Sequence, residues 1–127
     1  MFEIVHANIN VFDLERSIKF YKDAFELDLV RTKEPKEGSF KLAYLKAPKG
    51  DFLLELTWLR DMLKPYNLGD NESHICFAAD DFEDSYNRHL KMDCICYENK
   101  DMGVYFVEDP DGYWMEVKRA GWWNIIT

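Results

Sequence analysis

The sequence has no long apolar run, few cysteines and no cluster of basic residues, and each shortage excludes a class of protein. No stretch approaches the roughly 18 apolar residues of a membrane span, so we expect no membrane partner. The opening segment MFEIVHANINVF has neither the basic nor the apolar region of a secretory signal, and three cysteines do not make a disulfide framework. We therefore expect a soluble cytoplasmic protein.

Acidic residues exceed basic ones, and this imbalance bears on the partner. The 24 acidic and 16 basic residues give a formal net charge of −8, and no group of Lys and Arg follows the spacing of phosphates. We therefore do not expect nucleic acid as a partner. The length of 127 residues, with 47% apolar and 16% aromatic residues, suits one domain over residues 1–127.

The first half of the chain alternates between strand and helix patterns. Glu3–Phe12 alternates apolar and polar residues like a half-buried strand, and Asp13 is a candidate N-cap for an amphipathic helix that ends near Leu27. Three further strands are expected after turns that contain Pro and Gly, over Leu29–Lys33, Phe40–Lys46 and Phe52–Trp58.

The second half repeats this order. A strand is expected over Glu72–Ala79, then a helix capped by Asp80 or Asp81, then strands over Asp93–Glu98, Val104–Glu108 and Tyr113–Lys118. The expected fold class is therefore α+β with two βαβββ modules, residues 1–58 and 72–119. The linker 59–71 joins them, with a short helix expected over Leu59–Leu63.

The repeat brings chemically interesting residues into equivalent positions. A shift of 68 residues that aligns the helices also aligns His6 with His74. Glu55 and Glu116, separated by 61 residues, occupy the last strand of each half because the second meander is shorter. Each half therefore has one histidine on its first strand and one glutamate on its last.

Glu55 interrupts the apolar run FLLELTW, and a buried carboxylate needs a cation, hydrogen bonds or a raised pKa. If the first and last strands of each half meet around a cup, His6, Glu55, His74 and Glu116 can converge on one divalent cation. Nitrogen and oxygen donors suit Ni, Co, Zn, Fe or Mn. A lone His is more often structural, and a lone Glu can turn to solvent, but the repeat favours a metal site.

Several other residues have less specific interpretations. His89 is interpreted as a surface or packing residue, and Cys76, Cys94 and Cys96 as small core residues, with a place near the metal as the alternative for Cys76. Trp58 and Trp114 could line a pocket, although core packing is the commoner role. The segment EDPDG has Pro110 second and Gly112 fourth, which is typical of a type I turn.

The segments HANINVFDLERSIKFYKDAF, FLLELTW, SHICFAADDFED and FVEDPDGYWMEV, in this order, resemble the glyoxalase I (lactoylglutathione lyase) branch of the vicinal oxygen chelate superfamily. The resemblance covers nearly the whole chain. It implies a curved, incomplete barrel of paired βαβββ modules, usually completed as a homodimer, with His6, Glu55, His74 and Glu116 as metal ligands. The short chain resembles bacterial members that prefer nickel or cobalt, with zinc as an alternative.

The chemistry implied is isomerisation of the hemithioacetal of a 2-oxoaldehyde, such as methylglyoxal, and a thiol to a 2-hydroxyacyl thioester. A divalent cation that holds both substrate oxygens would stabilise the enediolate, and a carboxylate would move the proton between carbons. Glu116 is the first candidate for this base, by analogy, and Glu55 the second. The rival interpretations are an epimerase, a dioxygenase, a drug-binding resistance protein without metal, and a purely structural or protein-interaction module.

Two positions depart from the relatives that use glutathione. Those relatives typically have Arg four residues after the first ligand and Asn four residues after the second, where this chain has Asn10 and Leu59. We therefore expect glutathione to be a poor thiol partner, although Arg60 and Lys100 are nearby cations that could compensate. The open sheet edges and the apolar tail GWWNIIT lead us to expect a homodimer.

Overall fold

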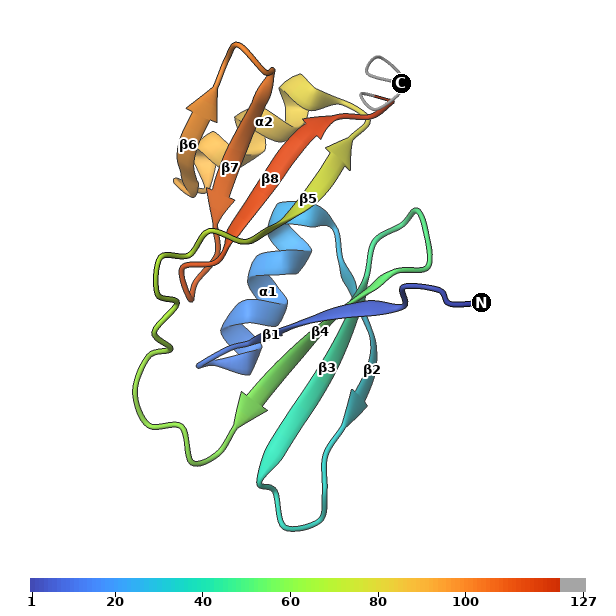
Figure 1. Cartoon of the computed structure of the whole chain (residues 1–127), viewed down its shortest axis with the longest axis vertical. Coiled ribbons are helices and arrows are strands. Elements are labelled where there is room, and N and C mark those ends of the chain that lie inside the picture. Colours follow the sequence, from blue (N-terminus) through green and yellow to red (C-terminus); the bar gives the residue numbers. More distant parts are fainter. Residues whose placement is uncertain (122–127) are drawn as a thin grey trace. The chain divides into compact units, whose positions relative to one another are not determined.

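The computed structural model describes residues 1–121 and contains two compact units, Met1–Asn67 and a second unit that begins at Leu68 (Figure 1). The first unit contains β1 (His6–Asn10), α1 (Leu14–Phe25), β2 (Asp28–Lys33), β3 (Phe40–Lys46) and β4 (Leu53–Leu59). The second contains β5 (His74–Ala79), α2 (Phe82–Lys91), β6 (Ile95–Asn99), β7 (Val104–Glu108) and β8 (Trp114–Arg119). The α+β class and the two βαβββ modules are confirmed.

Each unit has one four-stranded sheet, and the two sheets have the same topology. Their strand orders are β1-β4-β3-β2 and β5-β8-β7-β6. The first and last strands of each unit pair in parallel, whereas the other pairs are antiparallel. Parallel pairing places residues that are distant in sequence side by side, and in both units it joins the strand with the histidine to the strand with the glutamate.

The helices begin where the sequence predicts. The Asp13 carboxylate accepts a hydrogen bond from the Arg16 backbone N–H (3.1 Å), and the Asp81 carboxylate accepts one from the Asp84 N–H (3.0 Å). Asp81, not Asp80, is therefore the N-cap of α2. Figure 1 shows each helix lying across one face of its own sheet, which leaves the other face of the sheet for a functional site.

The core of the second unit contains the third histidine. His89 is 1% exposed, and its Nδ1 lies 2.7 Å from the Tyr105 hydroxyl, which is also 2.6 Å from Ser85 Oγ. Burial raises the pKa of Tyr105 to about 12, so the phenol stays neutral at physiological pH. The packing interpretation of His89 is confirmed, and the surface alternative is wrong.

Two local predictions are wrong. Residues 59–63 form no helix, because Leu59 pairs with Phe40 and the Arg60 N–H then donates to the Ser39 carbonyl (3.0 Å), which continues the sheet. The three free cysteines are not fully buried core residues: Cys76 is exposed, and Cys94 and Cys96 are half-buried. Cys76 lies on the same face of β5 as His74, and Cys94 and Cys96 flank the start of β6, where the ladder is irregular.

The remaining predictions concern the membrane and the tail. Among residues 1–121, no helix is long and apolar enough to cross a bilayer. The expectation that the apolar tail adds surface for dimerisation concerns residues 122–127, which lie outside the described part of the chain.

Candidate metal centre

The first unit brings His6 and Glu55 together on one face of its sheet. Asn8 is directly opposite Glu55 in the parallel ladder, so His6, two residues before Asn8, shares its face. The His6 Nε2 lies 3.8 Å from Glu55 Oε1, and the two side chains are 40% and 14% exposed. The apolar run therefore contains a half-buried carboxylate with an imidazole beside it.

Two neutral donors also face the Glu55 carboxylate. A hydrogen bond from the Tyr44 hydroxyl to Glu55 raises the pKa of Tyr44, and partial burial adds to this shift. With its amide nitrogen turned towards Glu55, Asn8 donates to Oε1 over 3.0 Å. The Arg31 guanidinium lies over the Tyr44 ring, 5.9 Å from its centre. Glu55 is thus restrained by both a hydroxyl and an amide.

The second unit repeats the pair at equivalent register. Cys76 is opposite Glu116 in the ladder, and His74 Nε2 lies 3.1 Å from Glu116 Oε1. These side chains are 41% and 11% exposed. The Phe106 ring meets the His74 ring edge-on, with centres 5.2 Å apart.

The neighbours of Glu116 are weaker donors than those of Glu55. Phe106 occupies the position of Tyr44 and has no hydroxyl. Cys76 occupies the position of Asn8, and desolvation, together with the negative charge of Glu116, raises the pKa of its thiol to about 12. A thiol is a weak hydrogen-bond donor. Glu116 is therefore held chiefly by His74.

The four predicted ligands are present as two pairs, one in each unit. Within residues 1–121, no group of three or more His, Cys, Asp and Glu side chains gathers as a set of metal ligands. Each pair offers one imidazole nitrogen and one carboxylate oxygen, a donor set that suits a divalent cation. Each histidine is about 40% exposed, so each pair can accept further ligands. The residues fit half of a metal site in each unit.

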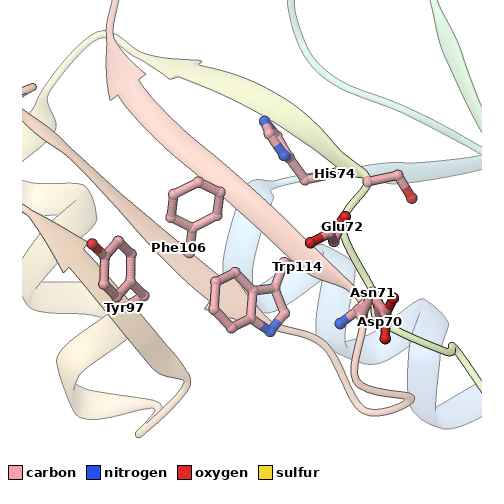
Figure 2. Close-up of a pocket in the computed structure, with 8 residues that line it drawn as sticks. Asp70, Asn71, Glu72, His74, Tyr97, Phe106 and Trp114 are labelled. Carbon is pink, nitrogen blue, oxygen red and sulfur yellow. The ribbon is translucent and has the colours of Figure 1, made fainter.

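A cavity of about 630 Å³ adjoins the second pair (Figure 2). It is lined by Asp70, Asn71, Glu72, Ser73, His74, Tyr97, Phe106 and Trp114. The predicted pocket role of Trp114 is therefore confirmed. Trp58 instead lines a separate hollow of about 370 Å³ at the start of α1, since it lies on the opposite face of β4 from Glu55.

The turn between β7 and β8 positions Trp114. The Gly112 N–H donates to the Asp109 carbonyl (3.0 Å), which confirms a turn at this place. The buried Asp109 carboxylate accepts the backbone N–H groups of Asp111 and Tyr113, both at 2.9 Å. Gly112 has φ +94°, a conformation that residues with a side chain rarely adopt. The turn thus fixes where β8 begins.

Sequence reasoning missed the residues that surround the two pairs. Tyr44 and Phe106 are opposite Glu55 and Glu116 in their ladders, and Arg31 and Tyr97 are the next neighbours across the sheet. Aligning the two middle strands of each half, as well as the first and last strands, could have identified these residues as equivalent neighbours of the two glutamates.

Known proteins resemble this chain over most of its length. The model of the Glyoxalase/Bleomycin resistance protein/Dioxygenase superfamily matches residues 3–117. Lactoylglutathione lyase of Haemophilus influenzae is 33% identical, with 90% of each chain covered, and that of Neisseria meningitidis is 32% identical, with 93% of this chain and 92% of the relative covered. The lactoylglutathione lyase of rice is 30% identical, but this chain spans only 43% of its length.

A solved structure supports the same relationship. The structure described as trypanothione-dependent glyoxalase I of Leishmania major is 30% identical, has a TM-score of 0.83, and is matched over 94% of this chain and 87% of its own. Maize glyoxalase I has a TM-score of 0.76 at 28% identity, with 90% of this chain but only 43% of its own covered. The repeated strand order, the duplicated His-Glu pairs and the match over residues 3–117 show that this chain belongs to the Glyoxalase/Bleomycin resistance protein/Dioxygenase superfamily.

Proposed function

We propose that this protein is a glyoxalase I-like lyase that converts the hemithioacetal of a 2-oxoaldehyde and a thiol into a 2-hydroxyacyl thioester. The observation that carries the proposal is the His-Glu pair repeated at the same register in both sheets. Relatives that cover about nine tenths of the chain are lactoylglutathione lyases, which supports the same reaction class.

His6, Glu55, His74 and Glu116 are the proposed ligands of one divalent cation, nickel or cobalt by preference and zinc as the alternative. The two pairs come from one chain or from two copies of it. When bound, such a cation supplies Lewis-acid stabilisation of the negative charge that develops on two adjacent substrate oxygens.

Glu116 is the proposed base. It takes the proton from the carbon that carries the sulfur and returns it to the neighbouring carbonyl carbon, while the hydroxyl proton moves to the other oxygen; the first carbon is oxidised and the second reduced. A carboxylate that moves a proton must reorient during the reaction. The thiol of Cys76 and the imidazole of His74 lie beside Glu116, whereas Tyr44 and Asn8 donate to Glu55 and restrain it, which favours Glu116 as the base.

A homodimer is proposed as the assembly. Within residues 1–121, each sheet ends in strands with an unpaired edge, and all six residues of the edge strand β2 are exposed. Leu29 and Val30 on this strand are 46% and 51% exposed, which a second copy of the chain could cover. Light scattering at micromolar concentration should give the dimer mass, and only the monomer mass would contradict this.

The deciding experiment combines metal analysis with kinetics. We expect purified protein loaded with nickel or cobalt to hold one ion per chain and to isomerise methylglyoxal hemithioacetals. Two ions per chain would indicate that each pair binds separately. No bound metal after loading would favour a binding or structural module. Bound metal without isomerase activity towards any thiol adduct would favour an epimerase or a dioxygenase.

A further inference from the structure

The cavity beside His74 has an aromatic wall. The Tyr97 and Trp114 rings are stacked, with centres 6.2 Å apart and planes at 20°, and Phe106 lies 5.4 Å from Trp114. Figure 2 shows these three side chains side by side on the sheet face, with His74 beside them. Tyr97 is 51% exposed, so the wall is open to a ligand.

The other wall of the cavity is acidic. Asp70 and Glu72 lie on the segment that precedes β5, and neither forms an ion pair or hydrogen bond with another described residue. Asn71, between them, donates from its side chain to the Gly112 carbonyl (2.9 Å), which ties this segment to the turn before Trp114. None of the eight described residues that line the cavity is Lys or Arg. The two carboxylates are thus held beside the aromatic wall without a counter-ion from the described chain.

The equivalent place in the first unit lacks this combination. Arg31 stands at the position of Tyr97, and Leu53 at that of Trp114. A cationic side chain therefore lies over the aromatic ring there, 5.9 Å from the centre of Tyr44. In the second unit Tyr97 takes the place of Arg31, so no guanidinium lies over Phe106 from that position, and the cation on the same face of β8 is Lys118, four residues beyond Trp114.

We propose that this cavity binds an alkylammonium group carried by the thiol part of the substrate. The face of an aromatic ring attracts a cation, Trp most strongly, and the two carboxylates add charge complementarity. A carboxylate on the thiol would be repelled by Asp70 and Glu72. Since the cavity contains His74, the ammonium group would lie close to the reacting end of the molecule. The statement that the ammonium group belongs to the substrate rests on the proposed function. Binding of an ammonium group in this cavity does not depend on the proposed function.

The first test measures binding without catalysis. Metal-free protein is titrated with 2-(methylthio)ethylamine and, separately, with its neutral analogue 2-(methylthio)ethanol, and the Trp114 indole N–H is followed by NMR. We expect the amine to bind about tenfold more tightly than the alcohol. Equal affinities, or an amine that shifts signals elsewhere but not Trp114, would overturn the proposal whatever the enzyme activity is.

Variants then test the two walls. Asp70→Asn with Glu72→Gln, and separately Trp114→Leu, should reduce the amine-to-alcohol affinity ratio towards one. Asp93→Asn with Asp101→Asn is the matched control, because it removes two exposed acidic residues of the same unit that do not line the cavity. A control pair that reduces the ratio as much as the cavity pair would show a general charge effect and contradict a specific site.

The second test uses the metal-loaded enzyme. Methylglyoxal adducts of cysteamine, 2-mercaptoethanol and 3-mercaptopropionate carry an ammonium group, no charge and a carboxylate. We expect kcat/KM to fall in this order, by about tenfold from the first to the second. Activity with all three adducts in the reverse order would overturn the ammonium site and leave the lyase proposal standing. No activity with any adduct, combined with the expected binding preference, would contradict the lyase proposal alone.

Discussion

The two units of this chain share a backbone plan and differ in the side chains placed around it. In both, the first strand pairs in parallel with the last, and histidine and glutamate lie two residues apart across the ladder. The pairing of β2 with β3 is irregular between Leu29 and Arg31, and the equivalent pairing of β6 with β7 is irregular between Ile95 and Tyr97. The pair is therefore the constant feature, and its surroundings are where the units have diverged.

The surroundings differ in the donors that face the glutamate. Tyr44 and Asn8 face Glu55, whereas Phe106 and Cys76 take their places near Glu116. Hydrogen bonds from a hydroxyl and an amide restrain a carboxylate more strongly than a thiol does. The difference indicates that identical ligands in a repeated fold can be given unequal roles by their neighbours.

The cores differ in a compensating way. Tyr21 of α1 and Ala43 of β3 are buried in the first unit, where the second unit has His89 of α2 and Tyr105 of β7. The large ring comes from the helix in one unit and from the strand in the other. Because cores are packed closely, such an exchange keeps the volume between helix and sheet filled.

The largest expected effect separates the two glutamates. Glu116→Gln should lower kcat by about a thousandfold with the fold retained, because the amide cannot take a proton from carbon. Glu55→Gln, measured at saturating metal, should lower kcat far less, since Glu116 remains. Steady-state kinetics with bound metal measured in parallel checks this. Equal losses in both variants, or near-native turnover of Glu116→Gln, would contradict the assignment of the base.

The next effect concerns the histidines. His6→Ala and His74→Ala should each weaken metal affinity by at least about tenfold, since each removes one proposed ligand. Competition with a chromogenic chelator measures the affinity directly. His89→Gln is the matched control, because His89 is buried against Tyr105 and should affect stability instead. If all three substitutions changed metal affinity alike, the effect would not be ligation.

A smaller effect is expected in the core of the second unit. Tyr105→Phe should lower the free energy of unfolding by about 1–2 kcal/mol, because Ser85 and His89 lose their buried partner. The Tyr105 pKa is about 12 when folded, so wild-type protein should lose stability as pH rises from about 10 to 12, and the variant should lose less.

Denaturant unfolding at pH 7 and pH 11 checks the Tyr105 prediction. Tyr86→Phe is the control, since its hydroxyl donates to the exposed Glu98 and its loss should matter less than that of the buried Tyr105 hydroxyl. Equal destabilisation by the two substitutions would show that burial of the Tyr105 hydrogen bonds adds nothing to the free energy of unfolding.

Part of the fold and of the candidate site could be predicted from the sequence, and part could not. Alternation, caps and turn residues act locally, which is why the strand over Phe40–Lys46 and the N-cap at Asp13 are predicted correctly. The helix expected over Leu59–Leu63 fails because pairing with Phe40, a tertiary contact, overrides local preference. The ligand pairs follow from the repeat, whereas Tyr44 and the acidic wall at Asp70 depend on cross-strand register and loop path, which periodicity does not encode.

The smallest effect, and the sharpest test of the comparison, exchanges the two aromatic neighbours of the glutamates. Phe106→Tyr should place a hydroxyl beside Glu116, as Tyr44 is placed beside Glu55, and restrain the carboxylate that has to move. We expect kcat to fall severalfold, with little change in KM, because a hydrogen bond to the carboxylate disfavours its protonation.

Tyr44→Phe is the reciprocal change, and it should affect metal affinity more than kcat, because Glu55 is proposed as a ligand and not as the base. The pH profile of kcat separates a hydrogen bond from a purely steric effect of the added hydroxyl. In Phe106→Tyr the hydroxyl should stabilise the Glu116 carboxylate and so shift the acidic limb of the profile to lower pH, whereas a steric effect alone should leave the limb unchanged. An acidic limb that shifts in Tyr44→Phe and stays fixed in Phe106→Tyr would mean that the roles of the two units are reversed.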